Sequence, residues 1–169
     1  MVEITYQMVL STLQTAGLLV GIFYYIMVLR NQQKSQKHAD ETRQAQLFMN
    51  IYKELLTGSE VMDLILDMEY DDFEDFERKY GRDNNPEAYD MITKHMLVVE
   101  GVGVLVKEGY VSVRLVALLT SGLIRIGWEK LRGYIFEMRK RAFPRWSSEY
   151  EYLYNTLMEY AEKHPELQI

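Results

Sequence analysis

The 169-residue chain contains no cysteine and only three prolines and three histidines. Without cysteine, the chain has no disulfide bond, no thiolate nucleophile and no zinc site built on sulfur. The histidines, His38, His95 and His164, are too far apart in sequence for metal-ligand spacing, so we expect no metal and no other cofactor. No segment alternates apolar and polar residues as a half-buried strand does. These absences together predict an all-α chain.

The longest uncharged stretch runs from Met8 to Leu29 and reads MVLSTLQTAGLLVGIFYYIMVL. As a helix these residues span about 33 Å, which matches the hydrocarbon core of a bilayer. Tyr6 and Tyr25 are spaced for the two membrane interfaces. A signal peptide is disfavoured because no basic residue precedes the stretch, and a soluble core helix is seldom apolar on every face. Residues 1–29 are therefore predicted to contain one transmembrane helix.

Four basic residues follow this stretch: Arg30, Lys34, Lys37 and Arg43. By the positive-inside rule, we expect a single-pass protein of the cell membrane, with its N-terminus outside and its C-terminal domain in the cytoplasm. Residues 30–46, RNQQKSQKHADETRQAQ, have no apolar side chain larger than alanine and predict a polar juxtamembrane stalk continuous with the span. Residues 47–169 are expected to form a compact cytoplasmic bundle of about six helices.

Helix-capping signals divide this predicted domain. A first helix is expected to end at Gly58, and later helices are expected to begin after Asp72, Asn85 and Ser112. A capping box from Ser148 to Glu151 predicts the start of the last helix. The apolar stretch 96–128 is interrupted by charged residues, so it predicts two core helices rather than a second span.

Three segments, FMNIYKEL, VVEGVGVLVKEGYV and GWEKLRGYIFEMRKR, resemble a family of uncharacterised small prokaryotic membrane proteins. In that family an N-terminal membrane helix precedes a compact helical domain with a Glu, a nearby Gly-x-Leu and a Trp. The matching residues are Glu100, Gly103, Leu105 and Trp128, followed by Glu137 and Arg139. The resemblance covers about residues 43–160 and implies the same architecture, but it brings no established activity.

One face of the predicted span carries Gln14, Gly17 and Gly21. Small residues four apart let two membrane helices approach closely, and a glutamine amide in hydrocarbon needs a hydrogen-bonding partner. We therefore expect this face to associate with another helix in the membrane. A lone span exposed to lipid is the alternative.

The span also suggests a pore. In an oligomer of five or more copies, Ser11 and Thr15 could line a narrow path, with Leu18 and Ile22 as an apolar constriction. The alternative is that each hydroxyl bonds to the carbonyl one turn back in its own helix.

Residues 58–90 hold twelve acidic and three basic residues, a net charge of −9 against −6 for the whole chain. The run DMEYDDFEDFE fails the EF-hand pattern because Asp72 stands where glycine is required. We expect a solvated acidic corner rather than a calcium site. An acidic chain without a basic stripe is also a poor ligand for nucleic acid.

Glu100 lies among valines and is expected to be partly buried with a cationic partner. Arg125 is the predicted partner, with Arg114 second, while Gly103 and Trp128 are expected to pack in the core. A buried carboxylate can also act as a general acid or base. No nucleophile or second placed carboxylate accompanies Glu100, so a structural ion pair is the better interpretation.

The sequence thus predicts a membrane-anchored, non-enzymatic interaction or assembly protein. Its expected partners are the lipid bilayer and either a second copy of itself or another membrane protein, with no nucleic acid. The alternative is an oligomeric ion channel or pore with a cytoplasmic helical sensor domain. A membrane-tethered enzyme has the least support.

Overall fold

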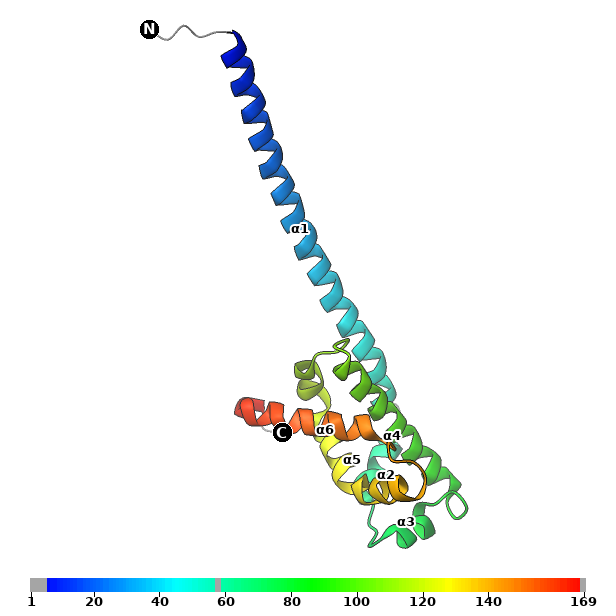
Figure 1. Cartoon of the computed structure of the whole chain (residues 1–169). Helices are drawn as coiled ribbons and strands as arrows, with labels where there is room; N and C mark the ends of the chain where they lie inside the picture. Colours follow the sequence, from blue (N-terminus) through cyan, green and yellow to red (C-terminus); the bar gives the residue numbers. More distant parts are fainter. Residues whose placement is uncertain (1–5, 57–58, 168–169) are drawn as a thin grey trace. The chain divides into compact units, whose positions relative to one another are not determined.

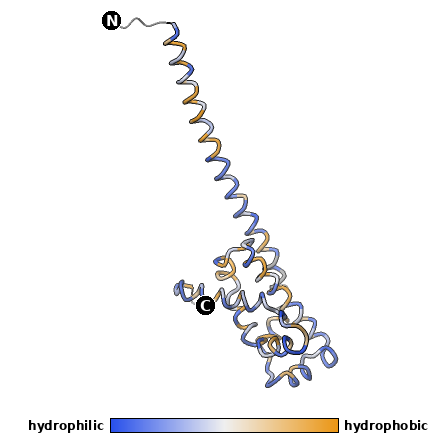
Figure 2. Tube along the Cα trace, in the orientation of Figure 1, coloured by the Kyte–Doolittle hydropathy of each residue, from blue (hydrophilic) through white to orange (hydrophobic). Residues whose placement is uncertain are grey.

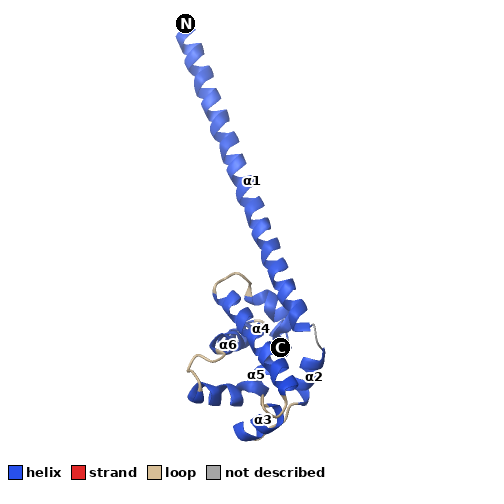
Figure 3. Ribbon diagram, turned by 90° about the vertical axis from the view of Figure 1, so that its right-hand side faces the viewer, coloured by secondary structure: helices blue, strands red, loops and turns tan. Residues whose placement is uncertain are grey.

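The computed structural model describes residues 6–56 and 59–167, and every regular element in these ranges is helical (Figures 1 and 3). A short 3₁₀ helix, Pro165–Leu167, follows the last of six α-helices. The α-helices are α1 (Tyr6–Leu56), α2 (Ser59–Asp67), α3 (Phe73–Tyr80), α4 (Pro86–Lys107), α5 (Val113–Arg141) and α6 (Ser148–Lys163). The predicted all-α fold is confirmed.

The chain divides into two compact units, Met1–Arg43 and Gln44–Ile169. Helix α1 contributes to both and runs without interruption through the predicted span and the predicted stalk. The change at residue 29 is therefore one of composition and not the end of a helix, as the hydropathy along α1 shows (Figure 2). Gly58, the predicted end of the first helix, lies outside the described residues.

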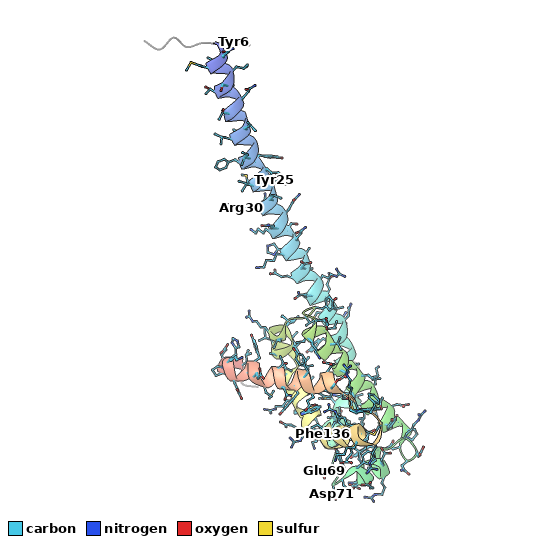
Figure 4. The ribbon with its side chains drawn as sticks, viewed as in Figure 1. Tyr6, Tyr25, Arg30, Glu69, Asp71 and Phe136 are labelled. Carbon is cyan, nitrogen blue, oxygen red and sulfur yellow. The ribbon has the colours of Figure 1, made fainter. Side chains whose placement is uncertain are left out.

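Nearly all of the apolar part of α1 is exposed. Every residue from Tyr6 to Met27 is exposed, and Tyr25 and Arg30 follow Tyr6 along the same helix (Figure 4). By length and composition, α1 is the one helix in the described part of the chain that could cross a membrane. Burying so much apolar side-chain surface in lipid is favourable, which is the physical basis for treating this segment as a span.

Helices α3, α4 and α5 begin at the predicted caps. The backbone amides of Asp75, Ala88 and Leu115 donate to the side chains of Asp72, Asn85 and Ser112 at 2.8, 3.2 and 3.3 Å. Each bond satisfies one of the amides that a helix leaves unpaired in its first turn. The 96–128 stretch falls into α4 and α5, as predicted, and both helices contribute buried faces to the core.

The second unit is organised around α6, which packs extensively against both α4 and α5, while those two helices have few direct contacts with each other. Helix α2 also packs against both. The end of α1 adds Phe48, which is fully buried in the same core. Other fully buried side chains come from α3, α4, α5 and α6: Phe76, Val99, Leu131, Tyr134, Tyr150 and Leu153.

The start of α6 differs from its prediction. Its N-cap is Ser147, which has φ 50° and ψ 39° in the left-handed region and makes no side-chain capping bond. Ser148 is already the first helical residue, and its Oγ donates to the Glu149 carboxylate at 3.4 Å. The predicted capping box is therefore wrong. The capping carboxylate comes instead from α4.

Candidate functional site

A shallow groove follows one side of α1 and is lined by Gly17, Leu18, Gly21, Ile22 and Tyr25. A Cβ placed on either glycine would meet no described atom within 4 Å. The groove exists because two side chains are missing one turn apart, between exposed larger ones. Gln14, predicted to share this face, is exposed one turn earlier. The arrangement offers space for the ridge of a neighbouring helix.

Of the two hydroxyl groups proposed as pore lining, that of Thr15 is engaged within α1, and the hydroxyl of Thr12 is engaged in the same way. Thr15 Oγ1 donates to the Ser11 carbonyl at 2.9 Å, and Thr12 Oγ1 donates to the Met8 carbonyl at 2.8 Å. A threonine that bonds to the carbonyl one turn back has already used its only donor. Leu18 and Ile22, the proposed constriction, line the glycine groove. These observations favour a helix contact over a polar pore wall.

Glu100 acts as the missing cap of α6. Its Oε2 accepts a hydrogen bond of 2.6 Å from the backbone amide of Tyr150, the third residue of α6. A carboxylate at this position satisfies an otherwise unpaired amide and interacts favourably with the positive end of the helix dipole. Glu100 is half-buried, as expected from its valine neighbours.

The predicted ion pair between Glu100 and Arg125 is wrong. Both residues are described, yet Glu100 binds the start of α6, and Arg125 Nε lies 3.9 Å from Glu129 Oε1, one turn along α5. The physical reason is the position of α6, which packs against both α4 and α5. The first turn of α6 donates a hydrogen bond to the Glu100 carboxylate, which was expected to pair with a cation of α5. Arg114, the second predicted partner, is exposed.

Gly103 allows α6 to start directly against α4. A Cβ at this position would lie 2.1 Å from the carbonyl oxygen of Glu149 and 2.7 Å from its carbonyl carbon, so only glycine fits here. The Glu149 side chain is held beside it by Lys107, whose Nζ donates to both carboxylate oxygens at 2.8 and 3.0 Å. The bonds from Lys107 lower the pKa of Glu149 below its ordinary value.

Tyr150 links three helices in the core. Its hydroxyl donates to the Ile124 carbonyl at 3.3 Å and lies 3.4 Å from Nε2 of His95. Gly127 provides the room, because a Cβ there would lie 2.4 Å from the Tyr150 hydroxyl. Trp128 is 4% exposed and its ring packs against Tyr150. Burial lowers the pKa of His95 to about 4, so this histidine is neutral at pH 7.

Arg139 holds the loop between α5 and α6. Its guanidinium donates to the carbonyls of Trp146 and Ser147 at 2.8 and 3.1 Å and pairs with Glu151 at 2.5 Å. These bonds help to keep Ser147 in a left-handed conformation that costs a non-glycine residue roughly 1–2 kcal/mol.

A cavity of about 200 Å³ lies between α4 and this loop. Thr93 and Glu100 line it from α4, and Phe143, Trp146 and Ser147 line it from the loop. The walls are mostly apolar, which is typical of small-molecule sites. We refer to this space as the loop cavity.

A wider, polar groove of about 710 Å³ runs beside the connection between α2 and α3. Glu69, Asp71 and Phe136 line it (Figure 4). Lys130 of α5 also lines it, and its Nζ donates to the Met68 carbonyl at 2.8 Å. Lys130 therefore attaches the segment between α2 and α3 to α5.

The acidic run is partly neutralised by nearby cations. Hydrogen bonds from Lys79 and Arg78 lower the pKa of Asp75 to about 2, and Glu74 pairs with Arg141 at 2.8 Å. Among the described residues, no group of three or more acidic or histidine side chains could hold a metal ion.

The sequence did not predict the Lys107–Glu149 pair or the bonds from Arg139 to the loop. Lys107 and Glu149 are 42 positions apart, and nothing in either local sequence indicates the other. Arg139 carried a signal, because it belongs to the segment that resembles the uncharacterised family, but its three acceptors all lie beyond the end of its own helix.

No protein-family model, no curated protein and no solved structure matches this chain. The resemblance to an uncharacterised membrane-protein family therefore stays an expectation, and the function must be argued from the chain's own residues.

Proposed function

We propose that this chain is a membrane-anchored, non-enzymatic assembly protein. In this proposal α1 crosses the cell membrane once, with the N-terminus outside, and associates through its glycine groove with a second copy of the chain or with another membrane subunit. The helical domain stands on the cytoplasmic side and makes further contacts. The observation that carries the proposal is an exposed, uncharged helical segment, Tyr6 to Met27, with a groove on one face.

A contact along the groove has a physical advantage in lipid. Lipid chains are as apolar as leucine, so membrane helices gain little from hydrophobic burial and depend on close packing and interhelical hydrogen bonds. Gly17 and Gly21 permit backbone approach, and the Gln14 amide gains a partner worth about 1 kcal/mol.

The non-enzymatic part of the proposal is supported by the role of Glu100. Its carboxylate caps the first turn of α6, and His95, whose Nε2 lies 3.4 Å from the Tyr150 hydroxyl, is buried in the core. A general acid or base must reach a substrate proton, which the buried position of His95 does not favour, and the carboxylate of Glu100 already has a structural role.

Mass measurement in nanodiscs tests the assembly. We expect the wild type to be oligomeric and Gly17→Leu/Gly21→Leu to weaken association at least about tenfold, roughly 1.4 kcal/mol, because leucine side chains fill the groove. Ala16→Leu is the matched control, since it enlarges another small residue of α1 on a different face. A monomeric wild type, or equal weakening by the control, would rule out self-assembly through this groove.

The orientation has its own test. Ser35→Cys places a single thiol in the predicted stalk, and no native cysteine competes for the reagent. We expect this thiol to react with a membrane-impermeant maleimide only after the membrane is opened. Labelling in intact cells would reverse the proposed topology.

A further inference from the structure

The loop cavity combines an apolar interior with polar groups near its two ends. Met96 and Leu97 of α4 face Phe143 and Trp146 of the loop across it. Leu97 and Phe143 are 68% and 50% exposed, so the cavity is open to solvent on their side.

Thr93 supplies a polar group that the fold does not use. Its Oγ1 is buried and has no hydrogen-bond partner in the described part of the chain. A buried hydroxyl without a partner carries a free-energy penalty, and a ligand that pairs with it recovers this loss. For comparison, the hydroxyl of Thr120 is also buried, but it donates a hydrogen bond to the Val116 carbonyl at 3.0 Å.

Glu100 supplies a negative charge to the same cavity. A carboxylate has about four acceptor positions, and the amide of Tyr150 occupies one of them. Arg145 also lines the cavity; its guanidinium is 3.7 Å from the Glu149 carboxylate, and 83% of its side chain is exposed to solvent.

Thr93 and Glu100 are seven residues apart on α4, so they share one face and are about 10.5 Å apart along the helix axis. Met96 and Leu97 lie between them. A ligand that uses both polar groups must therefore carry one polar group at each end of an apolar body.

We propose that the loop cavity binds a small amine with an apolar body and a hydroxyl at its far end. The ammonium group donates to Glu100, for which three N–H donors and a positive charge are well suited. The hydroxyl pairs with Thr93, and the body packs against Met96 and Trp146. A volume of about 200 Å³ restricts the body to the size of a single ring. This inference is independent of the proposed assembly through α1.

Tyramine is a suitable probe, because it has an ammonium group and a hydroxyl on opposite sides of one ring. Phenethylamine lacks the hydroxyl, and 4-ethylphenol lacks the amine. Binding is measured by ligand-observed NMR on the full chain in neutral nanodiscs, with empty nanodiscs as the reference for partitioning. A ligand of this size is expected to bind with a Kd of about 1 mM or lower.

Two substitutions assign the ends of the ligand. Glu100→Gln removes the charge but keeps an oxygen for the Tyr150 amide, and we expect tyramine affinity to fall about tenfold while 4-ethylphenol is unaffected. Thr93→Val removes the hydroxyl at constant shape, and we expect about threefold weaker tyramine binding with phenethylamine unaffected. Thr120→Val is the control variant and should leave binding unchanged.

Thermal unfolding of the same variants provides a second readout. Thr93→Val should raise the Tm because it removes a buried hydroxyl without a partner, whereas Thr120→Val should lower it because it removes a hydrogen bond. The proposal is overturned if folded wild type binds none of the three probes, or if the losses on Glu100→Gln are equal for tyramine and 4-ethylphenol.

Discussion

Replacing Gly103 by alanine should destabilise the helical domain by about 2–3 kcal/mol and lower its Tm by roughly 5–10 °C. The added Cβ would lie 2.1 Å from the Glu149 carbonyl oxygen, so the first turn of α6 must move away from α4. That movement would also stretch the Glu100–Tyr150 bond and the Lys107–Glu149 pair. The measurement is thermal unfolding of the full chain in detergent, followed by circular dichroism.

Gly101→Ala is the matched control, because Gly101 lies two residues earlier on α4 and a Cβ there meets no described atom within 4 Å. Alanine is a better helix former than glycine, so this variant should gain about 0.5–1 kcal/mol. Opposite signs for the two substitutions are the expected result. Similar effects of both would show that α6 does not start against Gly103.

Stability should fall by about 2 kcal/mol between pH 7 and pH 5 because of His95. Burial lowers the pKa of His95 to about 4, against about 6.5 in the unfolded chain. In the unfolded chain His95 therefore binds a proton as the pH falls below 6.5, while in the folded chain His95 stays neutral. The fold therefore has its full stability, as far as His95 is concerned, above about pH 6.5. This part of the stability is lost progressively as the pH falls to about 4.

Urea unfolding of the full chain at pH 7 and pH 5 measures this effect. His95→Gln keeps a hydrogen-bonding group near the Tyr150 hydroxyl but does not titrate, so most of the difference between the two pH values should disappear. His38→Gln, on the exposed part of α1, is the control and should retain it. A wild-type stability that is constant over this range would contradict the buried position of His95.

The parts of the fold that follow from local sequence were predictable. Asp72, Asn85 and Ser112 cap the helices that follow them, because a capping side chain reaches an amide only three residues away. The apolar part of α1 was equally predictable, because its length and composition alone show that it could cross a membrane.

The candidate sites in the helical domain depend on tertiary packing and were predicted less well. The local pattern at Ser148 resembles a capping box, but the left-handed Ser147 and the carboxylate of Glu100 determine how α6 begins. Arg125 was a reasonable partner for Glu100 as long as α4 and α5 were assumed to be neighbours. The position of α6 against both helices could not be read from periodicity, which gives the buried face of a helix but not the helix it meets.

In the proposed self-assembly, α1 contacts α1 of a second copy through the face that carries Gln14, Gly17 and Gly21. The absence of native cysteine makes disulfide scanning in native membranes a direct test, with one cysteine at a time along the span. We predict efficient cross-linking at positions 14, 17 and 21 and little at positions 12, 16 and 19, which point away from this face. No cross-link at any position, or equal cross-linking on both faces, would contradict self-assembly through this face.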